Sequence, residues 1–218
     1  MPNLSTAQTF AIWVIPVLLA ITLHEVAHGW VASKLGDQTA KILGRLTANP
    51  IKHIDLVGTI IVPGILLLTH AGFVFGWAKP VPVNYFNLKN PRRDMAFVAA
   101  AGPVSNLLMA LFWAGAAKLG MILTQADSSF GLWLVYTGQA GVMINIWLMV
   151  LNFIPIPPLD GSRIVASLLP RDAANAYSLI EPYGFFILFA MILTNVLQMI
   201  LLPPTEFFIT TIYALFGM

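Results

Sequence analysis

Long apolar runs alternate with short polar stretches along this chain of 218 residues. Four runs are close to the roughly 20 residues that a helix needs to cross the hydrocarbon core of a bilayer. They predict membrane-spanning helices at about 10–33, 95–119, 132–154 and 181–202. The pattern therefore predicts an all-α polytopic membrane protein, with residues 1–218 forming a single domain.

The stretches between these runs carry different signals. Thr39–Thr47 partly alternates between apolar and polar residues, which is typical of an edge strand. Lys79–Val83 must be extended, because its two prolines exclude a helix. Pro203–Pro204 is expected to stop the fourth helix, and Thr205–Met218 is then too short to span and is expected to lie at the membrane interface.

The apolar segment Leu56–Phe75 is interrupted by Pro63–Gly64. The distribution of charged residues decides whether this segment spans the membrane or enters it and returns to the same side. Lysines and arginines near spans favour the cytoplasmic side of a membrane. If the segment enters the membrane and returns, ten of the eleven lysines and arginines share one side and only Lys118 is on the other. If the segment spans, the split is five to six. We therefore predict a re-entrant segment at about 56–75, with the basic side facing the cytoplasm.

The composition excludes a soluble globular domain, because 58% of the residues are hydrophobic, 9% are charged and the mean hydropathy is +0.83. The chain contains no cysteine. Disulfides and thiolate metal sites are therefore excluded, and a tightly bound zinc would need histidine and carboxylate ligands.

The first predicted helix contains the motif His24–Glu25–Val26–Ala27–His28, an H-E-x-x-H pattern. Residues at positions i and i+4 share a helix face, so His24 and His28 can bind one metal ion while Glu25 reaches a water molecule on it. The alternative is a polar cluster that faces a helix bundle. We favour the metal site, because ionisable side chains inside a membrane helix are costly and usually functional.

Two histidines leave zinc short of a third protein ligand, and Asp160 is the candidate. An Asp–Gly pair such as Asp160–Gly161 is by itself most often a turn. In the re-entrant topology, however, the first and third helices run in the same direction, which brings Asp160 to the side of His24 and His28. If Leu56–Phe75 spanned the membrane, Asp160 would emerge on the opposite face.

These motifs together resemble the site-2 protease family of intramembrane metalloproteases. The H-E-x-x-H sequence matches, as does Leu159–Asp160–Gly161 preceded by Asn152–Phe153–Ile154–Pro155–Ile156–Pro157–Pro158. Gly102–Pro103–Val104–Ser105–Asn106 resembles the family's G-P-x-x-N element. The resemblance covers about Phe10 to Ser167 and is strongest to compact members without a PDZ or CBS domain.

The resemblance implies one zinc ion per chain held by His24, His28 and Asp160, with Glu25 as the general base. It also implies that Leu35–Asp55 is a short membrane-associated β element and that Asn152 contacts the substrate. We expect Ile42 and Leu46, on the edge strand, to bind an extended substrate by strand addition. Asn106 and Asn145 are interpreted as hydrogen-bonding links between helices, and His53 and His70 as structural rather than metal-binding residues.

The sequence thus predicts a zinc-dependent intramembrane endopeptidase that cleaves membrane-protein substrates in or near their transmembrane segments, in regulated intramembrane proteolysis. We expect it in the cell membrane as a multi-pass protein, in contact with the lipid bilayer, with its active site toward the cytoplasm and without a nucleic-acid partner. Two alternatives remain at this point, a divalent-metal transporter and an inactive scaffold member of the family. The pattern identifies neither the substrate nor the oligomeric state.

Overall fold

The computed structural model of the protein describes residues 4–69, 76–125 and 129–218. Within these ranges all regular structure is helical and no strand is present, so the predicted all-α class is confirmed. The α-helices are α1 (Thr6–Lys34), α2 (Thr39–Ile42), α3 (Val62–Leu68), α4 (Pro91–Thr124), α5 (Ser129–Phe153), α6 (Asp160–Leu168), α7 (Arg171–Ser178), α8 (Gly184–Leu193) and α9 (Val196–Phe216). Short 3-10 turns occur at Pro50–His53, Tyr85–Asn87 and Glu181–Tyr183, and a π-helical turn at Leu56–Ile61.

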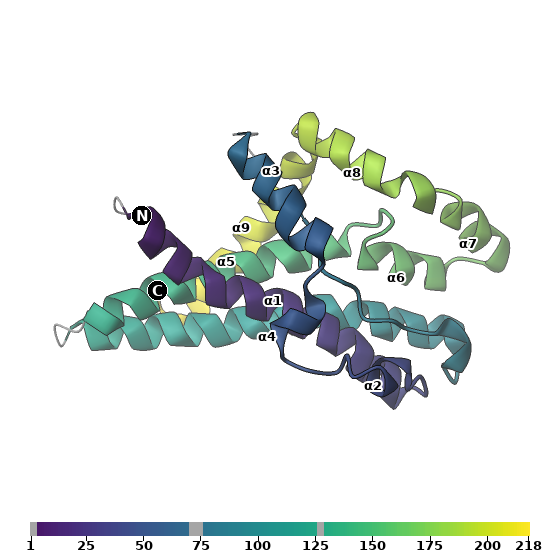
Figure 1. Ribbon diagram of the computed structural model, residues 1–218, viewed down its shortest axis with the longest axis horizontal. Coiled ribbons are helices and arrows are strands. Elements are labelled where there is room, and N and C mark those ends of the chain that lie inside the picture. Colours follow the sequence, from purple (N-terminus) through teal and green to yellow (C-terminus); the bar gives the residue numbers. More distant parts are fainter. Residues whose placement is uncertain (1–3, 70–75, 126–128) are drawn as a thin grey trace.

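Helices α1, α4 and α5 form the centre of the molecule, and α9 crosses behind them (Figure 1). Small residues allow α4 and α5 to approach closely, as is common between membrane helices. A Cβ atom at Gly138 would lie 2.7 Å from the Cβ atom of Ala117, and one at Gly120 would lie 2.7 Å from the backbone nitrogen of Val135. These close approaches pack α4 tightly against α5.

Among the described residues, five helical segments are long and apolar enough to cross a membrane, so the chain is a multi-pass membrane protein. Three of them are α1, α4 and α5, which coincide with the first three predicted spans but extend a few residues further at one or both ends. The extension of α1 has a local cause, since Ser5 and Gln8 form a capping box in which each side chain bonds the backbone N–H of the other. The remaining two are Arg171–Leu193 and α9.

The prediction for the fourth span, 181–202, is wrong in its boundaries. The helix breaks at Asn195, whose φ of 58° lies in the left-handed region that asparagine tolerates better than most residues. Pro203 and Pro204 do not stop α9, which continues to Phe216. Each proline removes one helical hydrogen bond, but α9 buries Leu201 and Ile212 in the main hydrophobic core, which offsets that loss.

The C-terminal stretch Thr205–Met218 is therefore part of a packed helix and not a segment lying at the interface. Lys118, near the end of α4, donates a 3.0 Å hydrogen bond from Nζ to the carbonyl of Gly217. Figure 1 shows the start of α1 and the end of α9 at the same end of the bundle, opposite to α6 and α7. Helices α8 and α9 together carry the chain from one end of the bundle to the other.

The expected β element in Leu35–Asp55 is absent from the structure, which has a helical turn at Thr39–Ile42 instead. The backbone N–H groups of Ile42, Leu43 and Arg45 donate to carbonyl groups four or five residues earlier in the chain. A partly alternating sequence of this length fits one helical turn as well as a strand. Because these donors are already used, this segment offers no free strand edge there.

Trp77, which follows the segment predicted to be re-entrant, lies beside the first residues of that segment. Leu56–Ile61 and α3 form its first part, and residues 70–75, with His70, fall outside the described ranges. On the return, the N–H of Trp77 donates to the carbonyl of Gly58 at 3.0 Å, and Thr59 Oγ1 donates to the carbonyl of Trp77 at 2.8 Å. The stretch 79–83 that follows has no regular secondary structure, as its prolines predict.

Asp37 anchors the loop that leads from this return into α4. Its buried carboxylate accepts hydrogen bonds from the hydroxyl and N–H of Thr39, the N–H of Asn84 and the side chain of Asn87. Burial raises the pKa of Asp37, but these hydrogen bonds outweigh it and hold the pKa below its ordinary value. The loop 76–90 is thereby fixed against the C-terminal end of α1.

Candidate metal centre

His24 and His28 lie one turn apart on α1 and face α4. Both side chains are buried, their rings meet edge to face with centroids 4.6 Å apart, and their Nε2 atoms are 3.0 Å apart. The rings fit because residue 102 of α4 is glycine. A Cβ atom at Gly102 would lie 2.5 Å from both His24 Cε1 and His28 Nε2.

The Nδ1 atoms of both histidines are hydrogen-bonded, which determines where their protons are. His28 Nδ1 lies 2.7 Å from the carbonyl oxygen of Val98, which can only accept, so Nδ1 carries the proton. His24 Nδ1 lies 2.7 Å from Oδ1 of Asn106, whose amide nitrogen donates to the carbonyl of Ala20 and so fixes the direction of the amide. In the neutral histidines, both Nε2 atoms therefore present lone pairs to the same point.

Asp160 completes the cluster from the first residue of α6. Its Oδ2 atom lies 3.1 Å from Nε2 of His24 and 3.2 Å from Nε2 of His28. Gly161 permits this position, because a Cβ atom there would lie 2.6 Å from the carbonyl oxygen of Ile154, the residue that follows α5.

The three converging atoms fit a metal ion. Two imidazole lone pairs and a carboxylate oxygen repel one another unless a cation lies between them, and Asp160 Oδ2 is buried with no hydrogen-bond donor. Tetrahedral zinc, with bonds of about 2.0–2.1 Å, would place neighbouring ligand atoms roughly 3.3 Å apart. The observed separations of 3.0, 3.1 and 3.2 Å are close to that value. The donor set therefore suits zinc, and one coordination position stays free for water.

Glu25 is half-buried, and its carboxylate is held by the loop 76–90. Its Oε2 atom accepts a 2.7 Å hydrogen bond from the backbone N–H of Val81. Arg45 supports this contact, because its guanidinium donates to the carbonyl groups of Lys79 and Pro80 at 2.9 and 3.3 Å. The carboxylate is thus oriented through one oxygen, which leaves the other available.

The contacts of the predicted substrate-binding residues do not include the side chains of His24, His28 or Asp160. Asn152 donates to the carbonyl of Leu148 within its own helix α5. Ile42 is 80% exposed. Leu46 packs beside Gly29 of α1, where a Cβ atom would lie 2.6 Å from the Leu46 side chain and 2.8 Å from that of Val81. Their role in substrate binding stays a prediction, and strand addition at Ile42 loses its structural basis.

The sequence interpretation did not predict that Asn106 and Gly102 would contact the histidines or that Val81 would contact Glu25. Asn106 does link helices, through a 2.9 Å hydrogen bond to Oδ1 of Asn145, but it also orients His24. The Gly102–Asn106 element was recognisable as a motif, and its spacing places the glycine and the asparagine on one helix face. Val81 acts through its backbone, which no side-chain pattern reveals.

Sequence comparisons agree with this geometry. The chain is 39% identical to "Putative zinc metalloprotease YwhC" of Bacillus subtilis over 199 residues, which cover 87% of this chain and 84% of that protein. It belongs to this zinc metalloprotease family. It is also 26% identical to "Putative zinc metalloprotease Rip2" of Mycolicibacterium smegmatis and 25% identical to the Mycobacterium tuberculosis protein of the same name, covering 89% of this chain and 71% of each relative. No protein-family model and no solved structure matches the chain.

Proposed function

We propose that the protein is a zinc-dependent intramembrane endopeptidase of the site-2 protease type. The observation that carries the proposal is the convergence of Nε2 of His24, Nε2 of His28 and Oδ2 of Asp160 within 3.2 Å of one another inside a bundle of membrane-spanning helices. Family membership supports the metalloprotease activity. The place of the cluster in the bundle supports cleavage within the membrane.

The depth of the site follows from helix geometry. Glu25 lies 19 residues after the start of α1 and nine residues before its end, that is about 28 Å and about 14 Å of helix rise. The cluster is therefore within the membrane-spanning part of α1, but closer to the end that carries Lys34. Water reaches such a position more easily than the centre of the bilayer, and a substrate helix must unwind only near its end.

Each residue around the candidate metal centre has its own role in the proposed peptide hydrolysis. Zinc held by His24, His28 and Asp160 would polarise the scissile carbonyl and lower the pKa of a water molecule. Glu25 accepts the proton of the attacking water and returns it to the leaving amine nitrogen. Asn106 and the carbonyl of Val98 keep Nε2 of each histidine unprotonated. The N–H of Val81 holds the Glu25 carboxylate in place.

The proposed topology has the basic end of the bundle in the cytoplasm and Leu56–Phe75 as a re-entrant segment. The hydrogen bond between Trp77 and Gly58 supports the return of that segment to its starting level. Figure 1 supports the orientation, because the end of α1, the start of α4, and α6 with α7 lie together at the end opposite to both termini. This arrangement groups ten of the eleven lysines and arginines on one side.

Reconstitution tests the proposal. The protein in liposomes is mixed with a single-pass helical peptide, and the products are identified by mass spectrometry. We expect zinc-dependent cleavage at a bond within or next to the apolar span of the peptide. Cleavage confined to soluble regions of the peptide would contradict intramembrane proteolysis, and zinc uptake into the liposomes without cleavage would favour a transporter.

A further inference from the structure

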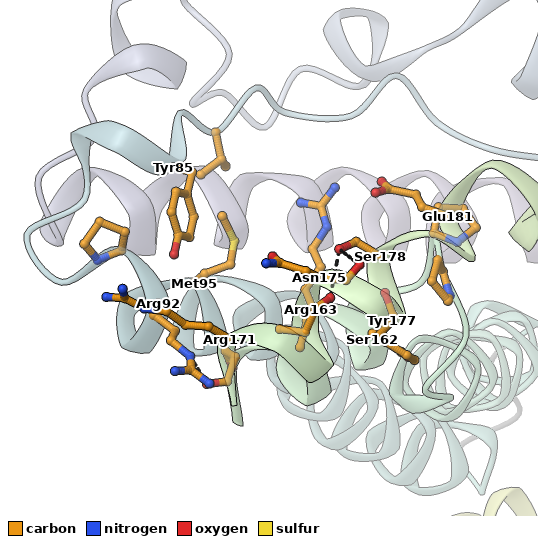
Figure 2. A pocket seen from close by; sticks show the side chains of 17 residues that line it. Tyr85, Arg92, Met95, Ser162, Arg163, Arg171, Asn175, Tyr177, Ser178 and Glu181 are labelled. Carbon is orange, nitrogen blue, oxygen red and sulfur yellow. Dashed lines mark hydrogen bonds between the residues drawn. The ribbon is translucent and has the colours of Figure 1, made fainter. Parts of the chain in front are cut away.

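A cavity of about 790 Å³ lies between the start of α4, helix α6 and helix α7, next to the metal centre but lined by different residues (Figure 2). Its polar walls carry Arg92 from α4, Arg163 from α6 and Arg171 and Asn175 from α7. Glu181 is the single carboxylate among the lining residues. Three guanidinium groups against one carboxylate make the cavity strongly positive.

Most hydroxyl groups that line the cavity already donate hydrogen bonds within the protein, which leaves the guanidinium groups as its charged donors. The hydroxyl groups of Ser162, Ser167 and Ser178 donate to backbone carbonyls of their own helices, and that of Tyr177 to the carbonyl of Pro155. These four groups therefore have no proton to offer to a ligand.

Arg92 uses only Nε, which donates to the carbonyl of Ser167 at 3.1 Å, and keeps its terminal N–H groups. Within the described ranges, Arg163 and Arg171 form no ion pair and no side-chain hydrogen bond. Figure 2 shows Arg92 and Arg171 at one side of the cavity and Arg163 nearer its middle. Guanidinium groups bind oxyanions, above all phosphate, through paired N–H donors.

The position of the cavity indicates where the phosphate comes from. It lies where α4 begins and where the apolar segment Arg171–Leu193 begins, at one boundary of the spanning helices. Leu168, the last residue of α6, and Leu179, directly after α7, are 76% and 74% exposed. Apolar residues beside a basic cavity at this level match the acyl chains and headgroup of a lipid.

We propose that this cavity binds the headgroup of an anionic phospholipid, with Arg92, Arg163 and Arg171 supplying the positive charge of its walls. The site is separate from the proposed protease chemistry and does not depend on it. Each arginine near an anionic headgroup contributes on the order of a five- to tenfold gain in affinity. Loss of two arginines should therefore weaken binding roughly 30-fold.

The test is native mass spectrometry of the full chain released from nanodiscs of equal phosphatidylglycerol and phosphatidylcholine. We expect the wild-type protein to retain one phosphatidylglycerol in preference to phosphatidylcholine, and the Arg163→Ala/Arg171→Ala variant to lose that preference. Lys89→Ala/Arg93→Ala is the matched control, because it removes the same charge from the same boundary and neither residue lines the cavity. Arg163→Gln/Arg171→Gln, which keeps the side-chain stems, replaces the alanine variant if that variant does not fold.

Three results would overturn the proposal. Equal loss of phosphatidylglycerol in the control and the cavity variant would mean general attraction of basic residues to the membrane surface. Binding of glycerol phosphate in phosphatidylcholine nanodiscs with the affinity of phosphatidylglycerol would assign the cavity to a soluble phosphate. Displacement of the lipid by a short polyglutamate peptide at lower concentration than by glycerol phosphate would assign it to an acidic protein segment.

Discussion

The backbone N–H of Val81 donates a hydrogen bond of 2.7 Å to the carboxylate of Glu25, which lies 56 residues earlier in the chain. This contact joins the loop 76–90 to the residue that we propose as the general base. The loop is itself fixed by Arg45 and by Asp37, so the position of the carboxylate depends on segments from three parts of the sequence. Substitutions in the loop should therefore alter the reaction rate without altering the metal.

Val81→Pro tests this contact, because proline has no N–H to donate. We expect kcat to fall about tenfold to a hundredfold, the effect of losing one hydrogen bond to a charged group, while the zinc content stays unchanged. Val83→Pro is the matched control, since it also follows a proline and its N–H makes no hydrogen bond in the described part of the chain. Equal activity of the two variants, measured by peptide cleavage, would contradict a role for the Val81 N–H.

Asn106→Leu should weaken zinc binding, because His24 loses the acceptor that keeps its proton on Nδ1. Residues that orient metal ligands typically change metal affinity about tenfold to a hundredfold. Competition with a fluorescent zinc chelator measures the change. Asn152→Leu is the control and should bind zinc as tightly as the wild type, because Asn152 bonds only to its own helix. If Asn106→Leu kept full affinity, Asn106 would be only a link between helices.

Gly102→Ala should disrupt the metal centre by steric contact. The added methyl group would lie 2.5 Å from both histidine rings, which forces α4 or the rings to move. We expect at least a tenfold loss of zinc affinity. Gly115→Ala adds the same group to the same helix, but its nearest neighbour outside the local backbone is a Phe216 atom at 3.6 Å, and its zinc affinity should not change. Similar affinities for both variants would show that the close approach at Gly102 is not required.

The cluster of candidate metal ligands was predictable, because the sequence signal for each residue is either a spacing along one helix or the direction of a helix. His24, Glu25 and His28 follow from the spacing along one helix, and the direction of the third helix then selected Asp160. Asn106 was interpreted only as a link between helices, because an amide inside a bundle has the same sequence signature whether or not it also orients a ligand. Its hydrogen bond to His24 depends on how α1 and α4 pack.

Errors in the fold have similar physical causes. The pattern at Thr39–Ile42 is too short to distinguish a strand from a helical turn. Pro203 and Pro204 are strong signals for the end of a helix, yet burial of Leu201 and Ile212 lets α9 continue through them. The true break at Asn195 depends on a positive φ in an otherwise apolar run, which residue type alone does not predict.

Single cysteines test the topology, because the chain has none of its own. Asn87→Cys and Ala173→Cys should be protected from an impermeant thiol reagent on intact cells. Met218→Cys should react at once, as should Ser128→Cys, which lies outside the described residues. Labelling of Asn87→Cys from outside would mean that Leu56–Phe75 spans the membrane. Protection of Met218→Cys would mean that α8 and α9 each cross the membrane.

The most direct measurement compares the wild type with Glu25→Gln in the same liposomes, with zinc content and peptide cleavage determined on each sample. The substitution keeps the size of the side chain and a hydrogen-bond acceptor for Val81, but removes the base. We predict about one zinc per chain in both proteins and a loss of cleavage of about a hundredfold to ten-thousandfold in Glu25→Gln, the range of general acid–base catalysis. Cleavage by Glu25→Gln at the wild-type rate, or a wild-type protein that cleaves without zinc, would contradict the account.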